Sequence, residues 1–527
     1  MDKNDEATLE ESMSSVKCPE GDSGAAERRV RGKHVIFMMV VALTSILQGT
    51  VTKGWTAVLP KMQDDPHSFV NTDSDVAWLV SMTSVVGILA SLATGPLVEW
   101  AGPRRLLAIA MAVSTGLWLL MVFPPNKVVF FAARAGLAAC AYVISTISLP
   151  LLAEMSPNNV RGSVSTLSEV GGSTGVLYGY LVAFLFPWKI ATGLCTLTAA
   201  LLFLPLWLVP ESPYWLVRRG RLDDAKASLQ RLMGSKAAKA VEEEMEAITN
   251  RPTATQTSLL QQFTELRKGQ NFRPVVLVLS FFVLRELGGR SCIMMYTVYI
   301  FRDAGVELDA FTCTVLVGAA RLVCTCVTAA VLDHVGRRPL LISTAVVASV
   351  SQSVCGLFLF LQLPGASMVP LVAVLVYIAA YGTGVGPIPW VYVGELVPSP
   401  VRSLGASIIT ACDAFVVFSI NLAFLRIIDA IGLATTFLAF GGLNLVIAVI
   451  VCLWIPESRG VSLHELEEAF AKKESLCDLK EALAKENDPG ELKETVVKEH
   501  SPGDLNVVFI DKKGSSDDVD GKEPCIV

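Results

Sequence analysis

The chain has 527 residues, of which 52% are hydrophobic and 17% are charged, and its mean hydropathy is +0.52. This composition excludes an ordinary soluble globular protein and favours an integral membrane protein. The formal net charge of -6 arises mainly in tails and loops, so it says little about the embedded part, and we expect no nucleic-acid partner.

Residues 1–33 form a polar, acidic tail that ends in a basic cluster, Arg28, Arg29, Arg31 and Lys33. The tail lacks the short apolar core and the small-residue cleavage site of a signal peptide. The positive-inside rule places this cluster in the cytosol.

About twelve apolar runs follow between Val35 and Trp454. Each run has the roughly 20 residues that a membrane-spanning helix needs. When the spans alternate from a cytosolic start, the basic turns fall on the cytosolic side, and an even number of spans returns the C-terminus there. We therefore expect a multi-pass protein of the plasma membrane with both termini in the cytosol.

Three short motifs recur in the second half of the chain at nearly one offset. The spacings are 234, 241 and 246 residues, for the pairs Glu99 and Asp333, Glu154 and Glu395, and Pro210 and Pro456. Internal repeats of this kind are typical of transporters. They predict an all-α membrane protein of twelve transmembrane helices in two pseudo-symmetric six-helix halves, residues 34–210 and 272–455.

A polar segment, residues 211–271, separates the two halves. It includes the helix-favouring stretches Leu222–Met233 and Ala237–Ile248. Two interpretations remain open: a solvated linker, and cytosolic helices that brace the halves.

Residues 456–527 are expected to form a second cytosolic tail. Apolar residues at helical spacing, Leu463, Leu466 and Phe470, predict a short amphipathic helix. From about His500 the composition is typical of disorder.

The tenth span contains Gly386-Pro387-Ile388-Pro389-Trp390. Proline removes a backbone donor and its ring clashes with the preceding turn, so a broken helix is predicted here. Because irregular backbone at membrane depth must face protein or a water-filled cavity, we expect the break beside a central cavity, with Trp390 at its edge.

Taken together, these motifs resemble those of the sugar porters, the glucose-transporter-like family of the major facilitator superfamily. The motifs are the two Gly…Asp/Glu…Gly…Arg-Arg loops, the two Glu…Arg pairs, Pro-Glu-Ser-Pro at 210–213, the Gly-Pro-Ile-Pro-Trp run, and Pro-Glu-Ser-Arg-Gly at 456–460. The arthropod facilitated trehalose transporter-like branch is the most similar. The resemblance covers about residues 35–470 and implies the major facilitator fold, with two halves that rock around a central site for a hexose or a trehalose-like disaccharide.

The loop motifs predict a latch at the cytosolic ends of the helices. Its residues are the acids Glu99, Glu154, Asp333 and Glu395 and the cations Arg104, Arg105, Arg161, Arg337, Arg338 and Arg402. Exposed ion pairs stabilise by only about 0–1 kcal/mol each, which suits a reversible contact. Positive-inside topology alone would explain the arginines but not the matched acids.

The expected sugar site departs from the family pattern. On the seventh span, two family glutamines are Arg285 and Glu286 and a family asparagine is Ser291. Glu286 and Arg290 stand i,i+4 on a helix, so they are expected to neutralise each other. Arg285 and Arg290 lie about 140° apart on a helical wheel, so both could edge one cavity.

On the fifth, eighth and eleventh spans, the family positions hold Glu169, Arg321 and Asp413, and we expect the last two to pair. The predicted substrate-binding set is therefore Glu169, Arg285, Glu286, Arg290, Ser291, Arg321, Trp390 and Asp413. Because a charge at bilayer depth costs about 2.5–3.5 kcal/mol, these groups either neutralise one another or bind a solute. Both interpretations remain open.

Lys53 and Arg134 are assigned a coupling or structural role. Lys53 is expected near the outer end of the first span, where some proton-coupled family members carry an acid, and Arg134 matches a family arginine. For both residues, extension of the side chain to the outer interface is the alternative interpretation, which is favoured for Lys53. Since lysine replaces the acid, facilitated diffusion is favoured over proton coupling.

Two alternative functions remain: a carrier of an organic anion or other charged solute, and a transport-poor nutrient sensor whose C-terminal tail engages cytosolic partners. An enzyme, a cofactor and a metal are not expected, because we find no phosphate-binding loop, no metal-spaced ligand set and no Ser/His/Asp arrangement. Cys324 and Cys326 form the only tempting cysteine pair, and no His or acidic ligands accompany them.

Overall fold

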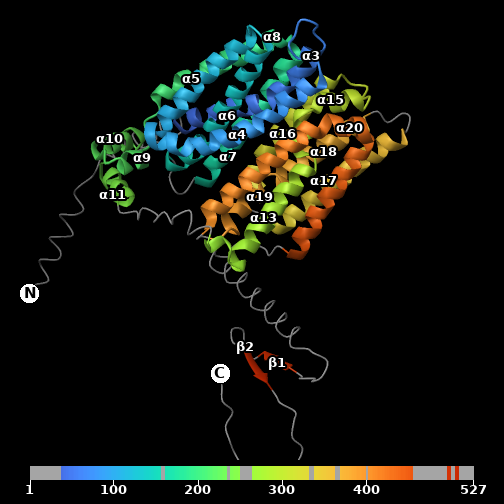
Figure 1. Cartoon of the computed structure of the whole chain (residues 1–527). Coiled ribbons are helices and arrows are strands. Elements are labelled where there is room, and N and C mark those ends of the chain that lie inside the picture. Colours follow the sequence, from blue (N-terminus) through green and yellow to red (C-terminus); the bar gives the residue numbers. More distant parts are fainter. Residues whose placement is uncertain are drawn as a thin grey trace, which may run out of the picture. The chain divides into compact units, whose positions relative to one another are not determined.

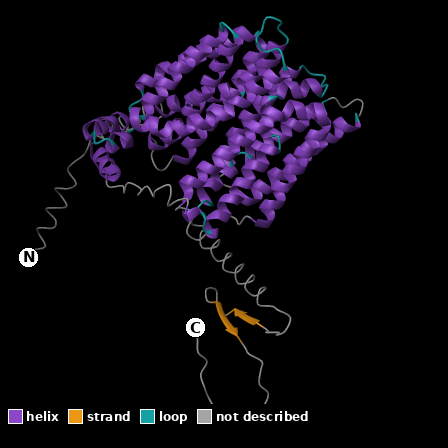
Figure 2. Cartoon of the chain, viewed as in Figure 1, coloured by secondary structure: helices purple, strands orange, loops and turns teal. Residues whose placement is uncertain are grey.

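A computed structural model describes most of the chain: residues 37–155, 161–233, 238–249, 264–331, 337–362, 368–398, 401–454, 495–499 and 505–509. These residues are almost entirely helical (Figure 2). The chain divides into two compact units, Met1–Leu463 and His464–Val527.

The N-terminal half is a bundle of long apolar helices (Figure 1). They are the first helical span Phe37–Gln63, which contains η1 (Gly54–Val58) and α3 (Leu59–Gln63), then α4 (Asp73–Ala101), α5 (Pro103–Val122), α6 (Lys127–Met155), α7 (Arg161–Leu185), α8 (Trp188–Phe203) and η3 (Leu204–Leu208). The first span packs closely on α7, because a Cβ at Gly49 would lie 1.9 Å from the Gly172 carbonyl oxygen.

The C-terminal half repeats this plan with more interruptions. Its helices are α13 (Gly269–Leu287), α14 (Arg290–Met295), α15 (Thr297–Asp303), α16 (Ala310–Val331), α17 (Arg337–Leu361), α18 (Val369–Ala380), η4 (Tyr381–Val385), α19 (Ile388–Glu395) and α20 (Arg402–Trp454). Gly432 divides the 53-residue α20 into two spans, since its φ of 81° is not helical.

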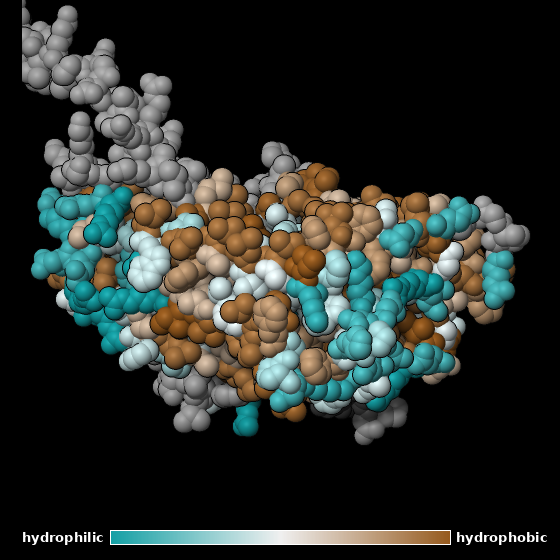
Figure 3. All heavy atoms as spheres, turned by 90° about the horizontal axis from the view of Figure 1, so that it is seen from above, coloured by the Kyte–Doolittle hydropathy of each residue, from teal (hydrophilic) through white to brown (hydrophobic). Residues whose placement is uncertain are grey.

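The described residues contain nine helices that are long and apolar enough to cross a membrane, one of them the double-length Leu404–Leu453. With that helix counted as two, and with α7 and the interrupted α13–α15 added, twelve spanning segments result. Leu89, Leu92 and Trp100 are 65–75% exposed, and Figure 3 shows apolar residues over much of one face, with hydrophilic residues gathered toward its ends. The prediction of a twelve-span, all-helical membrane domain is confirmed.

Three short helices lie in the segment between the halves: α9 (Pro213–Arg218), α10 (Leu222–Met233) and α11 (Ala238–Thr249). They share an apolar core of Leu229, Val241 and Ile248. Figure 1 shows them grouped at one end of the N-terminal half, which we call the linker end; the opposite end, with α3 and α15, is the distal end. The helical interpretation of this segment therefore holds, although its described contacts are with the N-terminal half.

The second unit contains one antiparallel hairpin, β1 (Thr495–Glu499) and β2 (Leu505–Phe509), in which Val497 pairs with Val507. Composition predicts no regular structure after about residue 500, so β2 is a difference from that expectation. The predicted amphipathic helix with Leu463, Leu466 and Phe470 lies outside the described residues.

Candidate solute-binding site

Three helices are interrupted near the middle of the membrane domain. The first span turns at Lys53, whose φ of -133° is followed by the 3-10 segment η1. The seventh breaks at Gly288 and at Gly289, which has a φ of 90°. The tenth changes from α18 to the π-turn η4 and resumes as α19, so the predicted break at the two prolines is confirmed. Lys53 and Gly288 are 235 residues apart, which matches the offset of the repeated motifs.

Buried amides bind the carbonyl that the seventh helix frees at its break. The Gly288 oxygen accepts hydrogen bonds from Gln352 Nε2 at 3.0 Å and Asn444 Nδ2 at 3.2 Å. Asn444 Nδ2 also lies 2.8 Å from Gln352 Oε1. Sequence reasoning missed these two residues; single amides inside apolar runs were the available signal.

Four charged groups of the C-terminal half neutralise one another beside this break. Arg285 lies 3.1 Å from Glu286 Oε1 and 3.1 Å from Asp413 Oδ1, and Arg290 Nη1 pairs with the same Glu286 oxygen. Arg285 Nη1 also donates to the Gly386 carbonyl at 3.3 Å. The expected i,i+4 pair of Glu286 with Arg290 is confirmed, but the expected pairing of Asp413 with Arg321 is wrong. The guanidinium of Arg285 reaches Asp413 across the bundle and neutralises it instead.

Aromatic rings surround the Arg285 guanidinium. Its carbon lies 4.4 Å from the Phe282 ring centre and 6.0 Å from that of Trp390. Trp390 stands edge-on to Phe282 at 4.8 Å and remains 47% exposed. Cation–π contacts of this kind add about 0.5–2 kcal/mol when desolvated. An exposed indole beside a paired cation offers a flat surface to the apolar face of a sugar ring.

Ser291 is held inside the C-terminal half. Asn421 Nδ2 donates to its hydroxyl at 2.9 Å, and the Tyr296 hydroxyl donates to the Asn421 carbonyl at 2.8 Å. Ser291 is only 3% exposed and Asn421 is fully buried. In this structure Ser291 is therefore a packing residue, and Asn421 is a further amide that the sequence interpretation missed.

Lys53 does not extend to the outer interface. It is half-buried and lies within electrostatic range of Arg321, Arg290, Glu286 and Glu169, which belong to both halves. The snorkelling expectation is wrong, because the turn at Lys53 directs the residue toward these charges. Glu169 is exposed and Arg321 is half-buried, and both lie near this group.

Arg134 is fully buried within the N-terminal half, so it does not snorkel either. Its Nη1 donates to the Val51 carbonyl at 2.7 Å, just before the turn at Lys53, and its guanidinium carbon lies 4.9 Å from the Trp55 ring centre. In the described part of the chain, its Nε and Nη2 have no hydrogen-bond partner. Arg134 thus supports the interrupted first helix.

At the linker end, three predicted latch residues bind the segment between the halves. Glu99 Oε1 pairs with Arg218 at 2.9 Å, Glu154 accepts a hydrogen bond from the Ser212 hydroxyl, and the Arg104 backbone N–H donates to Glu211 Oε1 at 2.8 Å. Burial raises the pKa of Glu154 and of Glu211, more than the hydrogen bonds that they accept lower it. These acids therefore dock the linker helices on the N-terminal half.

The remaining latch residues are only partly described. Arg105 is exposed and lies in the field of Glu211, and Arg338 donates to the Cys452 carbonyl at 2.7 Å. Arg337 is half-buried at the start of α17. Outside the described residues or side chains lie Asp333, Arg161, Glu395 and Arg402.

The two halves are joined at their distal ends and near their middle. At the distal end, Arg302 pairs with Asp64 at 3.0 Å and the Tyr299 hydroxyl donates to Gln63 at 2.7 Å. Nearer the middle, the Ser173 and Thr325 hydroxyls lie 2.9 Å apart. One further hydrogen bond between described residues of the two halves, from the Tyr180 hydroxyl to the Met294 carbonyl, lies between the distal end and the middle.

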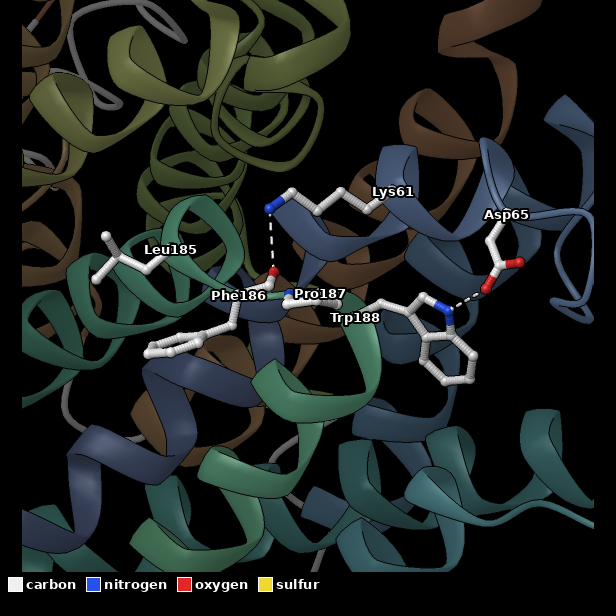
Figure 4. Close-up of a pocket in the computed structure, with 6 residues that line it drawn as sticks. All are labelled: Lys61, Asp65, Leu185, Phe186, Pro187 and Trp188. Atoms are coloured by element: carbon white, nitrogen blue, oxygen red, sulfur yellow. Dashed lines mark hydrogen bonds between the residues drawn. The ribbon is translucent and has the colours of Figure 1, made fainter.

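A pocket of about 410 Å³ lies at the distal end of the N-terminal half (Figure 4). Its polar groups are already bound to each other: Lys61 donates to the Phe184 and Phe186 carbonyls, and Trp188 Nε1 donates to Asp65 at 2.7 Å. The indole hydrogen bond holds the pKa of Asp65 below its usual range. The hydrogen bonds around this pocket therefore hold the helix ends together.

No three His, Cys, Asp or Glu side chains in the described ranges lie close enough to hold a metal ion.

Comparison with known proteins places this geometry in context. The profile of the family described as "Sugar (and other) transporter" matches residues 37–470. The chain is 30% identical over 448 residues to the facilitated trehalose transporter Tret1 of Aedes aegypti; the match covers 82% of this chain but only about half, 55%, of that relative. Identity to Tret1 of Apis mellifera ligustica is 28% over 450 residues, or 83% of this chain and 88% of that one.

A solved structure has the same fold. The inward open conformation of the xylose transporter XylE from E. coli superposes with a TM-score of 0.68 at 20% identity, and the match covers 82% of this chain and 98% of that one. At this identity the similarity establishes the major facilitator fold alone.

Proposed function

Because this chain belongs to the sugar (and other) transporter family, we propose that it carries a sugar across a membrane by alternating access. The expected solute is a hexose or a trehalose-like disaccharide, because its relatives include facilitated trehalose transporters. Major facilitator proteins move two halves around a site near the middle of the bilayer. The chain is a carrier and not an enzyme.

One observation supports this proposal above the others: the interrupted helices of both halves meet at one group of charged and aromatic side chains. Lys53 of the first span lies in the field of Glu286 and Arg290 of the seventh and Arg321 of the eighth. Broken helices at membrane depth need protein or water around them, and transporters bind their solutes at such places. The predicted substrate-binding set is proposed as this site, with Ser291 as its inner support and Trp390 as its stacking surface.

We propose that this structure is the conformation in which the distal end is closed. Asp64, Gln63, Tyr299 and Arg302 join the halves there. The latch residues would form the alternative closure at the linker end, with pairs that are each worth about 0–1 kcal/mol and therefore reversible.

The carrier is proposed to lie in the plasma membrane. Its linker end is proposed to face the cytosol. The arginine-rich turns at that end support this orientation. Transport is proposed to be facilitated diffusion, because the buried Arg134 has no carboxylate partner in the described ranges and Lys53 occupies the turn beside it.

The test is uptake by the full chain reconstituted in liposomes, with radiolabelled glucose, trehalose, a polyol and a dicarboxylate. We expect saturable uptake of a sugar, inhibition by unlabelled sugar, and no net accumulation when a pH gradient is imposed at equal sugar concentrations. Uptake no faster than in protein-free liposomes would contradict the transport proposal. Accumulation driven by the pH gradient would contradict facilitated diffusion alone.

A further inference from the structure

Two cations remain unpaired after the charges of the C-terminal half have neutralised one another. Glu286 is paired with both Arg285 and Arg290, and Asp413 is paired with Arg285. Within the described ranges, neither the Lys53 ammonium nor the Arg321 guanidinium has a hydrogen-bond or ion-pair partner, and Arg321 Nε is buried without one. Both side chains are half-buried, and cations partly removed from water normally have an anionic partner, so this pair lacks an anion.

Lys53 and Arg321 also belong to opposite halves and lie near one another. Arg321 lies within electrostatic range of Lys53. Both helices that carry them pack on α7: the first span lies against it at Gly49 and Gly54, and the Ser173 hydroxyl on α7 contacts the Thr325 hydroxyl on α16. The same Thr325 hydroxyl donates to the Arg321 carbonyl at 2.9 Å. Arg321 is therefore one helical turn from a contact between the halves.

Nearby acids do not balance these cations. With all groups ionised, the cations Lys53, Arg285, Arg290 and Arg321 face the acids Glu169, Glu286 and Asp413, which leaves one positive charge. Glu169, the only acid of this set outside the neutralised network, is exposed. Like charges in a low-dielectric environment repel strongly, and a bound anion would remove that repulsion.

We propose that Lys53 and Arg321 form an anion subsite, so that the solute is a sugar bearing a carboxylate, such as a hexuronate. The guanidinium can bind a carboxylate with two parallel hydrogen bonds, and the ammonium adds a point charge from the opposite half. The hydroxyls of the same solute can donate to Glu169, and its ring can lie on Trp390. This inference rests on the proposed transport function and specifies its substrate class.

The anion also links the two halves, because one of its cationic partners comes from each. Without it, repulsion between Lys53 and Arg321 opposes close approach of the halves at this level. With it, the two cations are held by one carboxylate. A neutral sugar would leave the repulsion in place.

The experiment compares glucuronate with glucose on the purified full chain in two assays, thermal unfolding in detergent and inhibition of labelled-sugar uptake in liposomes. For the wild type, we expect glucuronate to raise the unfolding temperature more than glucose does. We also expect glucuronate to inhibit uptake at a concentration about tenfold lower than glucose, because glucose lacks the carboxylate and therefore at least one charge-assisted hydrogen bond. Equal or weaker effects of glucuronate would overturn the proposal without any variant.

Variants assign the effect to the two cations. Lys53→Gln and Arg321→Gln should each remove the preference for glucuronate and raise the unfolding temperature of the ligand-free protein, because repulsion is lost. The matched control is Lys189→Gln, at an exposed lysine on the Trp188 ring at the distal end, which should keep the preference. Retained preference in both site variants would contradict the assignment.

The two proposals fail separately. If neither solute is transported but glucuronate still stabilises the wild type and not the variants, the anion subsite stands and the transport proposal falls. If glucose is transported and glucuronate neither binds nor inhibits, the transport proposal stands and the anion subsite falls.

Discussion

The interrupted first and seventh helices occupy equivalent positions in the two halves, but the buried charges beside them differ in whether they have a partner of opposite charge. Beside the break in the seventh helix, Arg285 and Glu286 are almost completely buried, and each is engaged by a group of opposite charge. Beside the turn in the first helix, Arg134 is also fully buried, but its contacts are one carbonyl and one aromatic ring.

This difference separates two roles for buried charge in one fold. A neutralised network fixes how helices pack, because breaking it leaves an uncompensated charge. An unneutralised cation either destabilises the protein by its desolvation cost or is available to bind an anion. The C-terminal half therefore supplies the rigid wall of the site, and the cations near the first helix supply its unsatisfied charge. Three sets of substitutions test this comparison, beginning with the largest expected effect, and a weaker pH dependence tests the docking of the linker.

Removal of the central carboxylate should have the largest effect. Glu286→Gln leaves Arg285 and Arg290 without their shared acid, so we expect the free energy of unfolding to fall by about 3–5 kcal/mol. Thermal or denaturant unfolding of the purified protein measures this. The control Glu265→Gln removes an exposed partner of Lys268 and should change stability by less than about 1 kcal/mol. Equal unfolding temperatures for the two variants would contradict the claim that Glu286 neutralises Arg285 and Arg290.

Replacement of the unneutralised arginine should act in the opposite direction. Arg134→Met removes a buried charge whose Nε and Nη2 lack partners in the described ranges, at the expense of one hydrogen bond to Val51. We expect no loss of stability, or a gain of up to about 2 kcal/mol. Arg285→Met, by contrast, should destabilise like Glu286→Gln. A large loss in Arg134→Met would show that this arginine has an ionic partner.

Substitution of the glycine at the helix break tests whether the seventh helix is packed as tightly as its network suggests. A Cβ on Gly289 would lie 2.4 Å from the Phe440 ring, and its φ of 90° is unfavourable for alanine. We expect Gly289→Ala to cost about 2–4 kcal/mol, from about 1–2 for the backbone and the rest for the clash. Gly305→Ala, with a φ of 62° and open space around it, should cost only the backbone part. Unfolding measurements that give equal losses would contradict close packing at the break.

Docking of the linker on the N-terminal half should depend weakly on pH. Because burial raises the pKa of Glu154 and Glu211, the docked state binds more protons than the undocked state above about pH 4.5. Docking is therefore favoured in acid and weakens as the pH rises through the raised pKa values. Hydrogen exchange of α9, corrected for its intrinsic pH dependence, should show less protection at the higher pH. Glu154→Gln should flatten this dependence, and Glu246→Gln, at an exposed position on α11, should not.

Much of the fold could be predicted from the sequence because its signals are local or repeated. Span length follows from apolar runs, the two halves from a shared offset, and the tenth-helix break from Pro387 and Pro389. The pair of Glu286 with Arg290 follows from helical spacing alone. These features need no knowledge of which helices meet.

The site was less predictable, because its partners come from different helices. Asp413 meets Arg285 and not Arg321, which depends on how α20 packs against α13. The turn at Lys53 has no proline or glycine pair to mark it, so its side chain was expected elsewhere. The roles of the amides Gln352 and Asn444 become clear only when the freed Gly288 carbonyl that they bind is known, and the role of Asn421 only when its contact with the Ser291 hydroxyl is known.

The most direct test of the carrier account is to fix the distal closure. Asp64 and Arg302, which pair across the halves, would be replaced by cysteine and joined by a short, reductively cleavable thiol crosslinker. In the parent chain the exposed Cys326 and Cys452, and Cys18, Cys477 and Cys525 of the tails, would be serine. We predict that sugar uptake into liposomes falls to the protein-free level, returns after reduction, and is unchanged by the reagent in either single-cysteine variant. Uptake that continues at the original rate in the crosslinked protein would contradict alternating access by movement of the two halves.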